Sequence, residues 1–121
     1  MSQHVRVLVA DDEPLIRALV TIAFEAAGYD VETAADGAEA LAKACQRPPQ
    51  AIVLDLMMPV MDGRVFLDAW RGQPASRTVP IVALSAGCRR EGRPPPAVRA
   101  LLTKPFDLDR LVATVTSLVG G

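Results

Sequence analysis

Five short apolar runs, spaced along the whole chain, constrain its fold more than any other feature. The first, Val5–Ala10, is β-branched and mostly apolar, as expected for a strand buried on both faces of a sheet. The others are Asp30–Ala34, Ala51–Leu54, Val79–Leu84 and Ala100–Thr103. Strands that alternate with helices form a parallel sheet covered by helices on both faces. We therefore predict an α/β fold.

The segments between these runs show helical periodicity and capping residues. Pro14 suits the first turn of one helix and Gly28 its C-terminal end. Asp36 begins the next, with Glu39 as its capping-box partner, and Asp107 caps the last. The predicted helices are Glu13–Ala27, Asp36 to about Gln46, Asp62 or Gly63 to about Trp70, and Leu108 to about Leu118.

The segment between the fourth and fifth runs breaks the alternation. It contains three consecutive prolines, Pro94 to Pro96, which remove backbone donors and disfavour helical neighbours. We expect a short or irregular fourth helix, with at most a single turn at Val98–Ala100. Five such strands usually adopt the flavodoxin-like order 2-1-3-4-5. With no repeat and no linker, we expect one domain over residues 1–121.

Composition excludes several classes of function. The net charge of −1 implies no broad attraction to nucleic acid or to a membrane surface. We find no secretory signal and no apolar stretch long enough to cross a bilayer. Cys45 and Cys88 have no zinc or disulfide spacing, so we expect reduced thiols in a cytoplasmic protein, with Cys45 packed and Cys88 in a loop.

Polar residues that could carry chemistry follow four of the strands. Asp11 and Asp12 follow the first, Asp55 the third, Ser85 the fourth and Lys104 the fifth. In a doubly wound parallel sheet, ligands bind at the carboxyl ends of the strands, and these four strands are neighbours in the predicted order. We therefore expect the five side chains to meet at one site.

Three clustered carboxylates repel one another unless a cation is bound. An all-oxygen site with phosphate and water as further ligands suits Mg²⁺. The central carboxylate, Asp55, can attack phosphorus and form an acyl phosphate, while Lys104 and Ser85 contact phosphoryl oxygens. Each residue alone has an ordinary explanation, such as a helix cap for Asp12 or a turn for Ser85. Their joint occurrence favours a phosphoryl site.

These motifs resemble those of the response-regulator receiver domain over essentially the whole chain. The matching segments are Val-Leu-Val-Ala-Asp11-Asp12-Glu13-Pro14, Asp55-Leu-Met-Met-Pro59-Val-Met-Asp62-Gly63, Ala83-Leu84-Ser85-Ala86 and Lys104-Pro105-Phe106. The resemblance implies that Asp55 is the phospho-acceptor and that Ser85 and Lys104 stabilise the phosphoryl group. It implies that Mg²⁺ is held by Asp11, Asp12, Asp55 and the backbone carbonyl of Met57. It also implies a cis Lys104–Pro105 bond that orients the lysine.

The chain departs from the family pattern at three places. Leu101 stands where the family usually has an aromatic switch residue, so switching cannot proceed in the usual form. Met57, two residues after Asp55, cannot orient an attacking water, and we expect slow self-dephosphorylation. The proline-rich segment, with Arg89, Arg90, Arg93 and Arg99 nearby, replaces part of the usual output face. It either orders on binding a partner or is a solvated loop.

The resemblance implies a signalling switch rather than an enzyme. Its phosphoryl donor would be a sensor histidine kinase or a histidine phosphotransfer protein, and its output an unknown downstream protein. We expect no nucleic-acid or membrane binding through this domain, and a monomer or weak homodimer. The alternative is a pseudo-receiver, a binding module that works without phosphorylation. An independent phosphatase is disfavoured because Met57 stands where a second acid would be needed.

Overall fold

The computed structural model describes residues 5–86 and 96–120. They form a five-stranded, all-parallel sheet of order β2-β1-β3-β4-β5, which confirms the predicted flavodoxin-like winding. The strands are β1 (Arg6–Ala10), β2 (Asp30–Ala34), β3 (Ala51–Asp55), β4 (Ile81–Ser85) and β5 (Val98–Thr103). The helices are α1 (Pro14–Ala26), α2 (Gly37–Gln46), α3 (Gly63–Trp70), η1 (Pro74–Arg77, a 3₁₀ helix) and α4 (Leu108–Val119).

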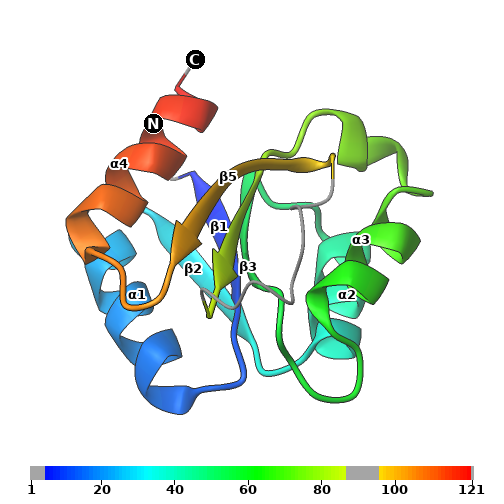
Figure 1. Ribbon diagram of the computed structural model, residues 1–121. Coiled ribbons are helices and arrows are strands. Elements are labelled where there is room, and N and C mark those ends of the chain that lie inside the picture. The colour runs from blue at the N-terminus through cyan, green and yellow to red at the C-terminus, as the bar shows by residue number, and fades with distance from the viewer. Residues whose placement is uncertain (1–4, 87–95, 121) are drawn as a thin grey trace.

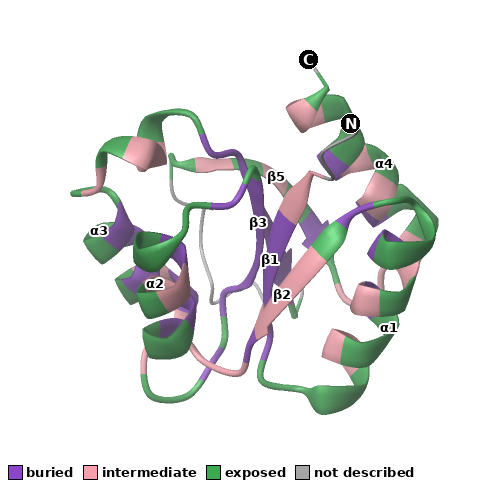
Figure 2. Ribbon diagram, turned by 180° about the vertical axis from the view of Figure 1, so that it is seen from behind, coloured by how far each residue is buried: buried purple, intermediate pink, exposed green. Residues whose placement is uncertain are grey.

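The helices cover the sheet on both sides, with α1 and α4 on one face and α2 and α3 on the other (Figure 1). Because side chains alternate along a strand, each strand contributes to two cores. In β1, Leu8 and Ala10 belong to the core under α2 and α3, whereas Val7 and Val9 belong to the core under α1 and α4. The central strands β1 and β3 are almost entirely buried (Figure 2).

Local signals in the sequence predicted the helix boundaries well. Pro14 is the first residue of α1, and Gly28 follows its C-terminal cap with a φ of 94°. The Asp36 side chain accepts a 2.8 Å hydrogen bond from the Glu39 amide at the start of α2. The Asp62 side chain caps α3 and that of Asp107 caps α4. Each cap satisfies amide groups that have no partner inside the helix.

Two expectations are corrected. Val98–Ala100 is not a helical turn but the first half of β5, because pairing with β4 satisfies its backbone groups along that edge of the sheet. Cys45 is exposed rather than packed, because Ala40 and Ala44 occupy the buried stripe of α2 and the next residue along points away from it.

The expected irregular fourth helix falls mainly outside the described residues. Of the segment between β4 and β5, the structure describes only residues 86 and 96–97, none of which is helical. Cys88 and the arginines of that segment also lie outside the described residues. None of the helices that the structure describes is long and apolar enough to cross a bilayer.

Candidate phosphoryl site

Three aspartates meet at the carboxyl edge of the sheet. Asp11 follows β1 directly and Asp55 ends β3, and the pairing of Ala10 with Leu54 sets these neighbouring strands in register. The carboxylates of Asp11, Asp12 and Asp55 each have an oxygen within 4.8 Å of the others. Asp11 and Asp55 are buried, and Asp12 is exposed. The structure thus brings together the acidic residues that the sequence placed at one site.

Backbone amides orient the two buried carboxylates. The amide of Glu13 donates a 2.9 Å hydrogen bond to Oδ1 of Asp11, and the amide of Met57 donates one of 2.9 Å to Oδ1 of Asp55. Both contacts are turns in which an aspartate accepts from the amide two residues on. The Arg17 guanidinium donates to the carbonyl oxygen of Asp11 at 2.7 Å, which ties α1 to the acidic loop.

Lys104 directly follows β5, the outer strand of the sheet, and its side chain reaches the acidic cluster from there. Its backbone amide donates to the carbonyl oxygen of Ser85 at 2.7 Å, and the Lys104–Pro105 bond is cis, as the resemblance implied. Its Nζ lies 3.0 Å from Oδ2 of Asp11 and 3.2 Å from Oδ2 of Asp55. Ser85, 4% exposed, ends β4 one position beyond the residue paired with Asp55.

Burial sets the electrostatics of the site. Desolvation raises the pKa of Asp55 to about 6, and the nearby Asp11 charge adds to this, while the Met57 amide and the Lys104 ammonium act in the opposite direction. Burial by itself lowers the pKa of Lys104, but the surrounding carboxylates raise it by more, so its pKa lies above the ordinary value. The Lys104 side chain therefore stays positively charged at ordinary pH, whereas the Asp55 carboxyl group gains or loses its proton at about pH 6.

The acidic cluster fits a divalent cation. Oδ2 of Asp11 is fully buried, and the Lys104 ammonium lies 3.0 Å from it in an ion pair. The same ammonium also pairs with Asp55 and Glu13, so one positive charge is shared among three carboxylates and a further cation would offset the excess negative charge. A set of carboxylate oxygens at a partly open edge is the donor chemistry that suits Mg²⁺.

The loop after β3 carries two exposed apolar residues. Met57 is 60% exposed and Val60 is 85% exposed, with a φ of 67° at Val60. The loop is anchored where the Gly37 amide donates to the carbonyl oxygen of Met61 at 2.9 Å, and a Cβ at position 37 would lie 2.1 Å from that oxygen. Gly37 therefore allows α2 to touch the loop.

Sequence reasoning missed several residues that shape the site. Glu13 was placed in a family motif and in a helix, and Arg17 in the same helix, without a role for either at the site. In the structure Glu13 contacts Lys104 and Arg17 contacts the Asp11 backbone. The position of Glu13 next to Asp12 was the available signal. Gly37 and Met61 are far apart in the chain, and the sequence contains no local signal for the contact between them.

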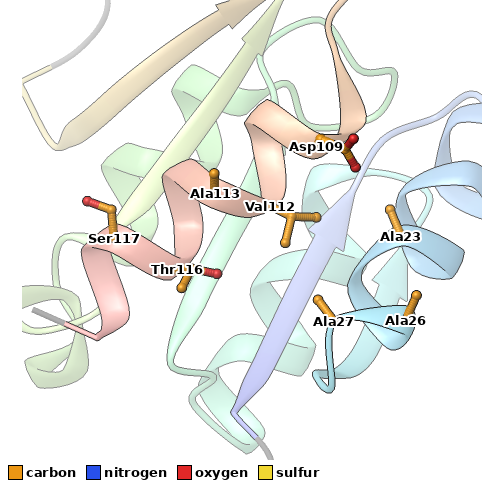
Figure 3. Close-up of a pocket in the computed structure, with 8 residues that line it drawn as sticks. All are labelled: Ala23, Ala26, Ala27, Asp109, Val112, Ala113, Thr116 and Ser117. Atoms are coloured by element: carbon orange, nitrogen blue, oxygen red, sulfur yellow. The ribbon is translucent and has the colours of Figure 1, made fainter.

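Two further surfaces lie away from the acidic residues. Leu101, on β5 and paired with Ala83, is 41% exposed, so its side chain is partly available at the surface. A shallow groove of about 630 Å³ lies between α1 and α4 (Figure 3). Among the described residues, its lining is mostly small and apolar, with one charged residue, Asp109.

Known proteins resemble this chain in sequence and in fold. The family model of the response regulator receiver domain matches residues 7–116. The chemotaxis response regulator CheY4 of Vibrio cholerae superimposes with a TM-score of 0.87 at 37% identity, over 96% of this chain and 99% of that one. The receiver domain of the sensor histidine kinase PA1611 of Pseudomonas aeruginosa, solved with magnesium in its active-site cleft, has a TM-score of 0.87 at 28% identity, over 98% and 100% of the two chains.

Curated relatives include longer proteins. The transcriptional regulatory protein PrrA of Mycobacterium tuberculosis is 40% identical over 121 residues, which cover 94% of this chain and 49% of that protein. The DNA-binding dual master transcriptional regulator RpaA of Synechocystis is 37% identical over 117 residues, covering 94% and 48%. The chain spans about half the length of the curated relatives it matches.

Proposed function

Because the chain belongs to the family of response regulator receiver domains, we propose that it accepts a phosphoryl group on Asp55 from a phosphohistidine donor. Receiver domains are phosphorylation-dependent signalling switches, which sets the reaction class. The observation that supports the assignment to Asp55 is its position at the end of β3. There its carboxylate contacts the positive charge of Lys104 and lies beside the negative charge of Asp11.

The residues have complementary roles in the proposed transfer. A carboxylate oxygen of Asp55 forms a bond to phosphorus as the P–N bond of the donor histidine breaks, and the departing imidazole takes a proton. Lys104 pairs with a phosphoryl oxygen, and Ser85 donates a hydrogen bond to another. Pro105 orients the lysine. Neither polar residue has to travel far, because Lys104 already contacts Asp55 and Ser85 ends the adjacent strand.

Asp11, Asp12, Asp55 and the backbone carbonyl of Met57 would hold the magnesium ion. When bound, the ion supplies positive charge that offsets the clustered carboxylates and a phosphoryl oxygen. The buried Asp11 Oδ2, which shares the Lys104 ammonium with Asp55 and Glu13, supports this assignment.

Phosphorylation replaces the single negative charge of the Asp55 carboxylate with a phosphoryl group that carries about two. Ser85 then moves toward the phosphoryl group, which alters the surface presented to a downstream protein. Leu101 stands at the position of the usual aromatic ring, so the signal does not pass through a ring at that position. We propose a cytoplasmic two-component phosphorelay in which residues 1–121 form the receiver domain, with a sensor histidine kinase or histidine phosphotransfer protein as donor.

The test is intact mass after incubation with a small acyl phosphate and Mg²⁺, for the wild type and for Asp55→Asn. One added phosphoryl group that requires both Mg²⁺ and Asp55 is expected. No addition, together with no Mg²⁺ binding, would overturn the proposal in favour of a phosphorylation-independent binding module.

A further inference from the structure

Lys104 has a third carboxylate partner that does not belong to the acidic cluster. Oε1 of Glu13 lies 3.1 Å from Nζ of Lys104, comparable to the distances to Asp11 and Asp55. The side chain of Glu13 is 57% exposed, whereas those of Asp11 and Asp55 are 0% and 4% exposed. Glu13 therefore holds the ammonium from the solvent side, and the two aspartates hold it from the buried side.

The same two buried aspartates are also the candidate cation ligands. Asp11 and Asp55 are two of the three residues of the acidic cluster, and their Oδ2 atoms are the ones that contact Lys104. An ammonium in this position competes with a divalent cation for the charge of the two carboxylates. The outcome of that competition depends on what else can hold the lysine.

The local backbone leaves the Glu13 side chain available for this contact. Glu13 is the N-cap residue of α1, but its side chain makes no capping hydrogen bond. Pro14, at the first helical position, has no amide hydrogen to cap. Meanwhile the amide of Glu13 donates to Oδ1 of Asp11, which places the residue beside the cluster.

We infer that Glu13 is a positioning residue that retains Lys104 at the rim of the site when a cation takes up the charge of Asp11 and Asp55. This inference rests on the proposed function. Glu13 then has two effects: it reduces competition between the lysine and the metal, and it keeps the ammonium where a phosphoryl oxygen will need it.

Mg²⁺ affinity measured by calorimetry tests this role directly. Glu13→Gln removes the negative charge that holds the ammonium on the solvent side, so we expect the Kd for Mg²⁺ to rise roughly three- to ten-fold. The matched control is Glu39→Gln, which removes the same charge from another partly exposed glutamate paired with a lysine, Lys43, on α2. The control is expected to leave the Kd unchanged within about twofold.

A double-mutant cycle with Lys104→Met separates positioning from a general charge effect. If Glu13 acts through Lys104, Glu13→Gln changes the Kd by less than about twofold when the lysine is absent. An equal rise in Kd in both backgrounds, or no rise in either, would overturn the inference. In those cases the wild type still binds Mg²⁺ and is phosphorylated on Asp55, so the proposed function survives. A wild type that does neither overturns the proposed function and this inference with it.

Discussion

Gly63 packs directly against the backbone of Asp55. A Cβ at position 63 would lie 2.8 Å from the carbonyl oxygen of Asp55 and 2.8 Å from Cα of Leu56. Both distances are shorter than a nonbonded contact of a Cβ atom allows. The amide of Gly63 also donates to the carbonyl oxygen of Leu56 at 3.2 Å. The first turn of α3 therefore fixes the strand end that presents the proposed phospho-acceptor.

Gly63→Ala is expected to lower the free energy of unfolding by roughly 1–3 kcal/mol, because backbone atoms must move to admit the methyl group. Chemical denaturation measures this change. Gly72→Ala is the matched control, since a Cβ there would meet the carbonyl oxygen of Ala69 at an ordinary 3.6 Å. Equal losses in the two variants would contradict the close approach at Gly63.

The raised pKa of Asp55 predicts a pH-dependent stability. Its pKa is about 6 in the folded protein against 3.8 without the fold, so the folded state binds more protons between these values. The contribution of Asp55 to stability is therefore fully present below about pH 3.8 and is lost as the pH rises through about 6. At neutral pH and above, the buried charge destabilises the metal-free protein.

Asp55→Asn removes that charge while keeping the shape of the side chain. Without metal and near pH 8, we expect it to raise the free energy of unfolding by roughly 1–3 kcal/mol. The gain should narrow as the pH falls from about 6 toward 4, and saturating Mg²⁺ should reduce it. Denaturation curves across this range measure the effect, and parallel pH profiles for the two proteins would show that Asp55 is not perturbed.

Val60 predicts a stabilising substitution. A β-branched residue with a φ of 67° is strained, and at 85% exposure its side chain contributes little packing. Val60→Gly is expected to raise the free energy of unfolding by roughly 0.5–1.5 kcal/mol. Val65→Gly, at a half-exposed valine in α3, should instead lower it by about 1 kcal/mol. If both substitutions destabilise, Val60 is not strained.

Met57 predicts a long-lived phosphoryl group. Its side chain is 60% exposed beside Asp55 and has no group that strongly orients a water molecule. Met57→Asn supplies such a group and should shorten the half-life of the phosphorylated protein several-fold, because a positioned water attacks more readily. Met57→Leu, which stays apolar, should leave the half-life unchanged. Loss of the phosphoryl group can be followed by intact mass, and equal half-lives for all three proteins would count against this role.

The outer face of α1 is where we expect the proposed phosphodonor protein to bind. Leu15, Leu19 and Ile22 are 70%, 41% and 63% exposed and share one face of the helix at a spacing of four and three residues. Exposed apolar groups at helical spacing favour contact with another protein. Ile22→Asp is expected to slow transfer from a cognate phosphohistidine protein at least tenfold, without changing phosphorylation by a small acyl phosphate. Equal slowing with both donors would place the defect in the site instead.

Much of the fold could be predicted from the sequence, because its signals are local. The alternation of five apolar runs with helical segments predicted a parallel sheet. Residues near the helix starts were equally informative: Pro14 lies in the first turn of its helix, and the side chains of Asp36, Asp62 and Asp107 accept hydrogen bonds from amides two or three residues further on. The convergence of the acidic residues followed from strand order alone. By contrast, we expected at most a single helical turn at Val98–Ala100, where the structure has the first half of β5.

What the sequence determined by itself was therefore the winding of the sheet and the identity of the groups at its carboxyl edge. Only the tertiary structure decided how those groups contact one another. The contact of Lys104 with Glu13 joins residues 91 positions apart, and the close approaches of Gly63 to Asp55 and of Gly37 to Met61 depend on how helices seat against loops. Such contacts arise from packing between elements, and residue type and local spacing do not encode them.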